Sequence, residues 1–289
     1  ARGAGTRAQS GETLTAAEHP AESLRQIATG LMLFPFFHHL WFLWFLWWFV
    51  LLFFAVAWLL RVLRVPALPA WIVRSPVCWL WLVPLTWWPQ SQMHMQGAMP
   101  GFGPDTSAGL LPIPHVFLYY AVFFGFGALY YGADDREGRL GRGWWLLLPV
   151  SLFVLLPLGL LIAYRDTSML AVIEGESVRR FLLIASQVLY AWAMTFGLMG
   201  LCRRVLSVDR PWIRYVSDSA YWLYLTHLPL VIWLQAVVRD AYVPALVKFT
   251  AITVFVTAVL LGLYQLTVRY TWIGRMLNGP RTRQASRGP

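Results

Sequence analysis

The chain has 289 residues, of which 58% are hydrophobic and only 12% are charged. A soluble globular domain carries about 25% charged residues, so this composition excludes an ordinary soluble protein and indicates an integral membrane protein. Lysine and arginine outnumber aspartate and glutamate by 23 to 13. Because these basic residues lie between apolar runs, they indicate membrane topology, and we expect no nucleic-acid partner.

Residues 1–30 are polar and of mixed charge, and we expect a disordered or interfacial segment there. Apolar runs follow, each about long enough for a helix to cross the roughly 30 Å hydrocarbon core of a bilayer. They lie at 38–60, 70–88, 113–132, 143–164, 180–201, 217–238 and 244–268. The sequence therefore predicts an all-α, polytopic integral membrane helix bundle over residues 31–270, followed by a basic tail at 271–289.

The run at 70–88 is the weakest because Arg74, Pro76 and Pro84 interrupt it. A proline donates no backbone hydrogen bond, so this run is expected to be kinked or partly re-entrant. The loop at 89–114 contains no lysine or arginine and is expected to fold over the outer mouth of the bundle.

The loops after the first, third, fifth and seventh runs hold most of the arginines. They contain Arg61, Arg64 and Arg74, then Arg136, Arg139 and Arg142, then Arg203, Arg204, Arg210 and Arg214, then Arg269, Arg275, Arg281, Arg283 and Arg287. The opposite loops hold only Arg165, Arg179 and Arg180, then Arg239 and Lys248. Since cytoplasmic loops are enriched in basic residues, we expect about seven transmembrane helices with the N-terminus outside and the C-terminus in the cytoplasm.

The sixth run carries polar and ionisable side chains. Tyr221, Tyr224 and His227 share one arc of the predicted helix, Asp218 lies at its edge, and His227 falls near the membrane midplane. Two interpretations have about equal weight. Tyr224 and His227 either bond neighbouring helices and hold the bundle together, or they line a substrate path. Pro229 is expected to kink this helix just beyond His227.

The first run begins with paired histidines, His38 and His39, beside Trp41 and Trp44. Tryptophan rings favour the membrane interface, so an aromatic belt is the simplest interpretation of the tryptophans. Paired histidines at a membrane mouth are also suited to moving protons or binding a polar ligand, and the role of His39 stays open.

Small residues predict close helix packing at two places in the chain. Gly125 and Gly127 lie in the third run, and Gly197 and Gly200 lie late in the fifth. Gln187, early in the fifth run, is most simply a packing position as well.

Neither a metal nor a bound cofactor is expected. Cys78 and Cys202 have no partner at metal-ligand spacing and are interpreted as small apolar residues. His94 lies between Met93 and Met95, a pattern suited to soft metals. Without a second ligand nearby, an ordinary loop histidine is the better interpretation.

Three segments together resemble one known family. They are HHLWFLWFL at 38–46, PDTSAGLLPIPHVFLYYAVFFGFGAL at 104–129, and WAMTFGLMGLCRRVLS with PWIRYVSDSAYWLYLTHLPLVI within 192–232. In this order they are similar to the membrane acyltransferase-3 family, and most similar to its glucan biosynthesis succinyltransferase-like branch. The resemblance extends from about Leu24 to Arg269.

The resemblance implies a multi-pass enzyme of the bacterial inner membrane. Such an enzyme passes an acyl group from an acyl-CoA-type donor to a hydroxyl of an envelope carbohydrate or glucan. Its catalytic base is taken to be a histidine on the first helix, and no segment of this chain matches that helix. We therefore expect the chain to lack the family's N-terminal helices and to be incomplete on its own, and no catalytic residue is assigned.

By motif match, six residues are expected to face the substrate tunnel, namely His39, Trp41, Asp218, Tyr221, Tyr224 and His227. Three arginines at the expected cytoplasmic mouth, Arg203, Arg204 and Arg214, are candidates for contacts with donor phosphates, because guanidinium pairs well with phosphate. Each of them singly is explained as well by membrane topology.

The alternative to an enzyme is a non-catalytic membrane subunit or scaffold, which would keep the acyltransferase fold without its catalytic first helix. A retinal protein needs a lysine near the middle of its last span, whereas Lys248 lies at the outer end of the seventh run, so that class is rejected.

Overall fold

The computed structural model describes residues 20–93, 101–164, 175–208 and 210–278. Every regular element within these ranges is helical. Within the described ranges, six helical segments are long and apolar enough to cross a membrane, which makes this a multi-pass membrane protein. They are His38–Val62, Pro114–Ala133, Trp144–Tyr164, Glu176–Leu206, Pro211–Val237 and Ala245–Val268.

The predicted run at 70–88 is divided in the structure. It forms α3 (Ala70–Arg74), a 3₁₀ turn (Pro76–Cys78) and α4 (Trp79–Ser91). Ser75 is extended (φ −113°, ψ 164°), which ends α3, because a residue before a proline disfavours the helical region. The expected break is thus observed, and neither piece alone meets the length of a span. Whether α3 and α4 cross together stays a prediction.

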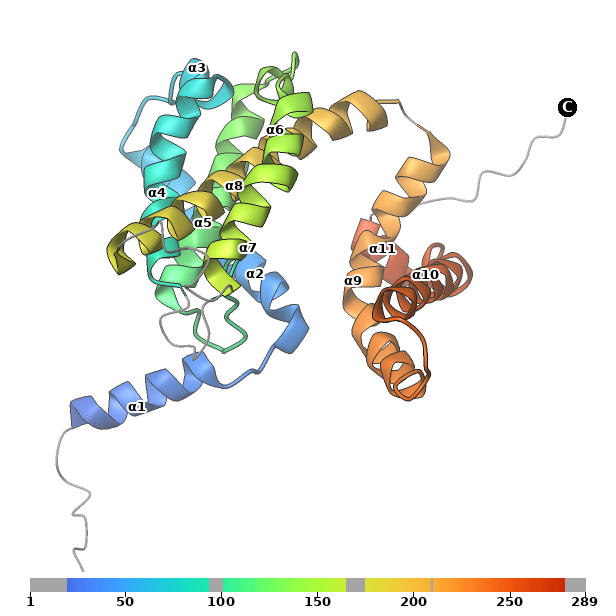
Figure 1. Ribbon diagram of the computed structural model, residues 1–289. Coiled ribbons are helices and arrows are strands. Elements are labelled where there is room, and N and C mark those ends of the chain that lie inside the picture. Colours follow the sequence, from blue (N-terminus) through green and yellow to red (C-terminus); the bar gives the residue numbers. More distant parts are fainter. Residues whose placement is uncertain (1–19, 94–100, 165–174, 209, 279–289) are drawn as a thin grey trace, which may run out of the picture.

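A bundle of α3 to α8 forms the main body of the protein (Figure 1). Its other members are α5 (Pro114–Ala133), α6 (Trp144–Val150), α7 (Leu156–Tyr164) and α8 (Glu176–Leu206), with a π-helical turn at Ser151–Leu155 joining α6 to α7. Helix α8 lies at the centre and packs against α4, α6 and α7. This bundle contains the larger of the two hydrophobic clusters in the described structure.

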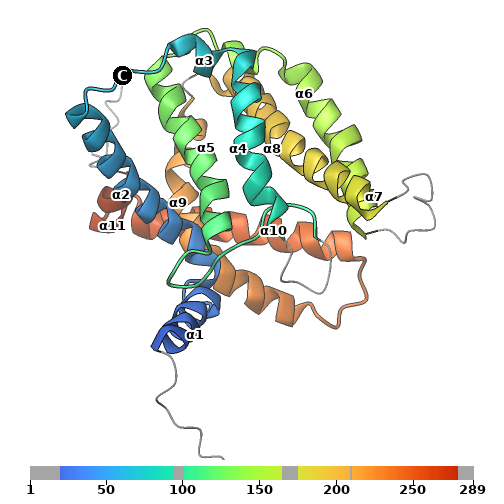
Figure 2. The same cartoon turned by 90° about the vertical axis from the view of Figure 1, so that its left-hand side faces the viewer.

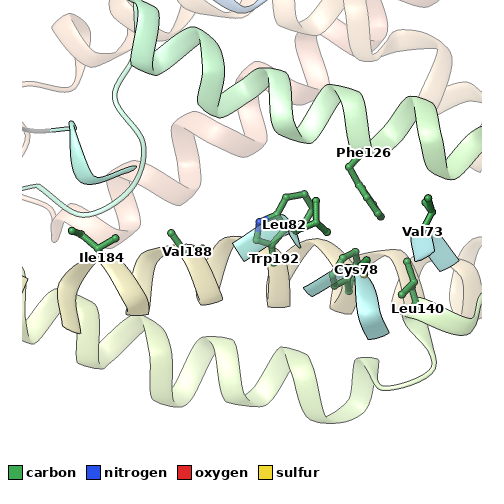
Figure 3. Close-up of a cluster of buried hydrophobic side chains, with 9 residues drawn as sticks. Val73, Cys78, Leu82, Phe126, Leu140, Ile184, Val188 and Trp192 are labelled. Carbon is green, nitrogen blue, oxygen red and sulfur yellow. The ribbon is translucent and has the colours of Figure 1, made fainter. Parts of the chain in front are cut away.

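Aromatic rings fill the centre of the bundle. Trp192 of α8 is fully buried and stacks on Phe123 of α5, with 4.2 Å between ring centroids. Its indole nitrogen donates to the Thr86 hydroxyl of α4 at 2.9 Å, so one side chain joins three helices. Figure 3 shows Trp192 beside Leu82, with Phe126 entering the same cluster from α5.

Glycines of α8 permit close approach to its neighbours, as predicted. A Cβ atom added at Gly200 would collide with the carbonyl oxygen of Gly141, and one at Gly197 would lie 2.8 Å from the Leu148 side chain. Gly125 and Gly127 behave differently, because no atom lies within 4 Å of a Cβ added at either. The expectation of close packing is therefore wrong for these two positions within the described structure.

Helix α2 (Trp41–Val62) follows a 3₁₀ turn at His38–Leu40 and packs on α5 through Phe45 and Phe49. The loop at 101–113 runs beneath it, and the Trp44 indole nitrogen donates to the Leu110 carbonyl at 2.9 Å. Helix α1 (Pro20–Leu33) projects from the bundle in both views (Figures 1 and 2). It is fixed to the same loop because the Leu111 N–H donates to the Leu31 carbonyl at 3.2 Å.

Helices α9 (Pro211–Val237), α10 (Ala245–Leu263) and α11 (Trp272–Asn278) form a separate group to one side of the bundle in Figure 1. Helix α9 continues through Pro229 as one element, and a π-helical turn at Tyr264–Val268 follows α10. The group is held together by hydrogen bonds from α9 to carbonyls of α10. Tyr215 donates to Leu261 at 2.7 Å, and Trp222 donates to Leu260 at 3.2 Å.

Candidate functional site

Three of the predicted tunnel residues meet where the start of α2 touches α9. The His39 and His227 rings lie edge to face, with centroids 5.7 Å apart and planes at 90°. The Tyr224 ring is 6.3 Å from His39 and 6.1 Å from His227. We call His39, Tyr224 and His227 the histidine cluster.

The backbone before α2 presents His39 to α9. His38 takes a left-handed conformation (φ 40°), and the 3₁₀ turn at His38–Leu40 leaves the His38 side chain exposed and that of His39 half-buried. The Tyr224 hydroxyl donates a hydrogen bond to the His39 carbonyl, although the two residues are 185 positions apart. This bond ties α9 to the turn that carries His39.

The protonation of His227 follows from its neighbours. Its Nδ1 lies 3.1 Å from the Leu223 carbonyl and 2.9 Å from the Tyr224 carbonyl. Both carbonyls only accept, so we assign the proton to Nδ1. In the neutral ring Nε2 then carries a lone pair, and no hydrogen bond involves Nε2 within the described residues. His227 thus offers an acceptor to a ligand.

The second imidazole has an unmet bonding group. His39 Nε2 is buried and has no hydrogen-bond partner among the residues that the structure describes. Buried polar atoms are usually paired, because an unpaired one loses its hydration without compensation.

A pocket of about 650 Å³ opens between α9 and α10, next to the histidine cluster. Tyr224 and His227 line it from α9, and apolar side chains such as Val231 and Val256 form most of its walls. Arg239 and Lys248 lie at its far end, where the Lys248 ammonium donates to the Arg239 carbonyl at 2.9 Å. The volume is that of a typical small-molecule site, which is about 300–1,000 Å³.

The other predicted tunnel residues lie apart from the cluster. The Trp41 ring packs against Phe45 at 5.3 Å and against Tyr120 of α5 at 5.1 Å, so it belongs to the α2–α5 interface. Tyr221 is 49% exposed, and Asp218 is half-buried on the part of α9 before Tyr221. Their places in a tunnel stay predictions.

The three arginines predicted to contact donor phosphates, Arg203, Arg204 and Arg214, are all exposed around the α8–α9 junction. Arg203 donates to the Asp135 carbonyl at 3.1 Å, and its side chain lies against Gly138. Arg203 therefore fixes the loop at 134–143 to the end of α8.

The Asp135 carboxylate is the buried centre of that loop. Burial by itself would raise the pKa of Asp135, but the backbone N–H groups of Arg139 and Leu140, the Tyr130 hydroxyl and the Arg203 charge together lower it. The Tyr130 hydroxyl donates to this carboxylate at 2.9 Å. Asp135 is thus held ionised as a structural anchor.

Sequence reasoning missed the α10 wall of the pocket. Lys248 was considered only as a topology residue and as a Schiff-base lysine, yet it lines the pocket with Thr253 and Thr257. These two threonines are four residues apart on a largely apolar helix, so they share one face. The four-residue spacing of Thr253 and Thr257 is the sequence pattern that could have predicted a polar face on this helix.

No group of three or more His, Cys, Asp and Glu side chains suited to a metal occurs among the described residues. His94, the one residue considered for a soft metal, lies outside the described residues.

A family model described as an acyltransferase domain, that of the acyltransferase-3 family, matches residues 13–265. The match contains the histidine cluster, both walls of the adjacent pocket and the whole α3–α8 bundle. No curated protein and no solved structure matches the chain.

Proposed function

This chain belongs to the acyltransferase-3 family, and we propose that it serves as a membrane O-acyltransferase. The donor would be an acyl-CoA-type thioester, and the acceptor a hydroxyl of an envelope carbohydrate or glucan. The family match over residues 13–265 is the observation that carries this proposal. The histidine cluster beside a pocket of small-molecule size supports it.

In this reaction the acceptor hydroxyl oxygen attacks the thioester carbonyl carbon. A C–O bond forms, the C–S bond breaks, and the hydroxyl proton passes through a base to the departing thiolate. We propose that the histidine cluster binds and orients that hydroxyl. His227 Nε2 accepts its hydrogen bond, and the His39 ring packs edge to face against the His227 ring. Orientation of this kind accelerates transfer by holding the reacting atoms near each other.

The donor is proposed to enter at the α8–α9 junction. Arg204 and Arg214 are exposed there and are suited to the phosphates of an acyl-CoA-type donor. Arg203 is proposed as a third contact, and its guanidinium also donates to the Asp135 carbonyl.

We propose a bacterial inner-membrane location, with seven crossings in which α3 and α4 together form the second. The N-terminal side would face outward and the C-terminus the cytoplasm. Arg203 contacts Gly138, so the arginine-rich loop at 134–143 lies beside the arginine-rich end of α8. This proximity supports a common cytoplasmic side for both.

Cysteine labelling tests this topology. With the native cysteines replaced, an impermeant thiol reagent added from outside is expected to label Ser91→Cys and to leave Arg139→Cys unlabelled. The matched control is labelling after the membrane is opened, when both positions should react. Labelling of Arg139→Cys alone in intact cells would reverse the orientation.

Transfer itself is tested in membranes that contain either residues 1–289 or the complete reading frame, including any sequence before Ala1. The membranes receive radiolabelled acetyl- or succinyl-CoA and a glucan, and label in the glucan is counted. Transfer by either form supports the enzyme, and transfer by residues 1–289 shows that this segment is sufficient. If neither form transfers label, the protein is the non-catalytic membrane subunit or scaffold.

A further inference from the structure

Two grooves meet at one lysine at the end of the α9–α10 pair. The first is the pocket of about 650 Å³ beside the histidine cluster, whose far end is formed by Arg239 and Lys248. The second has a volume of about 440 Å³ and lies between the same two helices and the turn that joins them. Both are lined by Val238, Lys248 and Ile252. We call them the long groove and the short groove.

Both grooves have apolar walls and exposed rims. Phe249 of the long groove is 67% exposed, and Val247 and Phe255 of the short groove are 52% and 50% exposed. Helices α9 and α10 are both long and apolar enough to cross a membrane, and they lie to one side of the bundle in Figure 1. In a bilayer the rims of the grooves therefore meet lipid chains, and an occupant must be apolar over most of its length.

The shared end of the grooves is basic. The Lys248 ammonium donates to the Arg239 carbonyl at 2.9 Å, which uses one of its three N–H donors. Neither Lys248 nor Arg239 forms an ion pair with an acidic side chain among the described residues. The joining turn contains one acidic residue, Asp240, which is exposed, so the two basic residues leave a net positive charge. This end of the grooves is thus suited to an anionic group.

The length of the long groove matches the depth of one membrane leaflet. His227 and Arg239 are about twelve residues apart along α9, a distance of about 18 Å at 1.5 Å per residue. One leaflet contributes about 15 Å of hydrocarbon, half of the roughly 30 Å core. Since the sequence predicts His227 near the midplane, Arg239 and Lys248 are expected at the level of the lipid headgroups.

We propose that one anionic phospholipid with two acyl chains occupies both grooves. Its phosphate binds Lys248 and Arg239, one chain follows the long groove from this basic end, and the other chain lies in the short groove. A zwitterionic lipid would bring a second cation to an end that is already positive. A ligand with a single chain would leave the short groove empty. The inference does not depend on acyl transfer, because lipid binding requires no chemistry.

The test is native mass spectrometry of the protein made from the complete reading frame, including any sequence before Ala1. The protein is released from nanodiscs that contain equal amounts of phosphatidylglycerol and phosphatidylcholine. The wild-type protein is expected to retain one phosphatidylglycerol in preference to phosphatidylcholine. Lys248→Gln removes the charge at the junction of the grooves, and this preference should fall about fivefold. Arg180→Gln is the matched control, since it removes the charge of an exposed arginine outside both grooves and should leave the preference unchanged.

A second pair of variants tests the place of the acyl chains. Ala251→Trp fills the short groove from α10 and leaves both basic side chains in place, so retention of phosphatidylglycerol should also fall. Ala258→Trp makes the same exchange at an exposed position of α10 outside both grooves and should leave retention unchanged. Thermal unfolding of each variant verifies that it is folded.

Four results would overturn the proposal. Equal retention of the two lipids by the wild-type protein would make the grooves ordinary lipid-facing surface. Unchanged retention in both Lys248→Gln and Ala251→Trp would place the lipid elsewhere. Displacement of the lipid by soluble coenzyme A would assign the basic end to phosphates of a soluble ligand. Retention by residues 1–289 but not by the complete reading frame would show that a protein segment covers the grooves.

Acyl transfer measured in the same samples separates failure of this inference from failure of the proposed function. Transfer is proposed to depend on the histidine cluster, whereas lipid retention is proposed to depend on Lys248 and the two grooves. Loss of one with the other intact therefore identifies which proposal is wrong.

Discussion

The α3–α8 bundle and the α9–α11 group are built in opposite ways. In the most apolar 18-residue stretch of α8, 44% of residues are buried, whereas in that of α9 none is. Aromatic stacking and glycine contacts fix the bundle from inside. Helix α9 is instead held by hydrogen bonds along its side, to α10 and to the turn before α2.

The difference shows where ligand-binding groups can lie in a membrane bundle. The closely packed region contains a pocket of about 350 Å³ between α4, α5 and α8, whereas the loosely packed region carries the histidine cluster and the pocket of about 650 Å³. Regions with few buried contacts open at lower free energy than a core. Helix α9, with few buried residues, is therefore the less tightly held wall of the histidine cluster.

The largest expected effect comes from breaking the bundle. Gly200→Leu places a side chain where the Gly141 carbonyl and the Trp144 Cβ lie, the latter 2.7 Å from an added Cβ. We expect a loss of about 3 kcal/mol of stability, since overpacking forces the helices apart. The loss should appear as a lower thermal unfolding temperature in detergent.

Gly127→Leu is the matched control, because no atom lies within 4 Å of a Cβ there. It makes the same exchange on α5 and should change the unfolding temperature little. Equal effects of the two variants would show that α8 is no more closely packed than the outside of α5.

The next largest expected effect is on acyl transfer and concerns the loosely packed α9–α11 group. His227→Ala removes the acceptor at Nε2 and should lower acyl transfer about a hundredfold, because the acceptor hydroxyl loses its orientation. The measurement is label transferred to the glucan by equal amounts of membrane-inserted protein. Trp233→Phe, an exposed position on the same helix, should leave transfer unchanged. Normal transfer by His227→Ala would make His227 a structural residue.

A smaller effect on acyl transfer is expected when the hydrogen bond between α9 and the turn before α2 is removed. Tyr224→Phe removes the hydrogen bond to the His39 carbonyl and keeps the ring in the cluster. We expect transfer to fall about tenfold, since His39 and His227 are then less firmly aligned. Tyr221→Phe removes the hydroxyl of an exposed tyrosine on the same helix and should have no effect. Equal losses in both variants would mean that the tie is not specific.

The sequence predicts the helical class and most spans because unbroken apolar runs of sufficient length have few alternatives in a bilayer. It also predicts the division of the run at 70–88, since Arg74 and Pro76 interrupt that run. It failed at Gly125 and Gly127, because composition alone does not show which face of a helix meets a neighbour.

The candidate site was predictable only in part. Helical spacing places Tyr224 and His227 on one arc, and the motif suggested His39, but their contact depends on how α9 docks against a turn 185 residues away. Gln187 was interpreted as a packing residue because the sequence does not show which residue of another helix it meets. Its partner Gln90 lies 97 residues earlier, and no local pattern links the two.

The smallest predicted effect concerns the end of the bundle where the loop at 134–143 meets α8. The pKa of Asp135 is lowered in the folded protein, so its ionised form stabilises the fold above its unfolded pKa of about 3.9. That stability is lost as the pH falls through the lower, folded pKa. Asp135→Asn should therefore lower the free energy of unfolding by about 1 kcal/mol at pH 7, and the difference from wild type should shrink below about pH 4.

Asp134→Asn is the control, because Asp134 forms an exposed ion pair with Arg136. It should change the unfolding midpoint little at either pH. A difference between Asp135→Asn and wild type that does not vary with pH would show that shape, and not charge, holds this loop on α8.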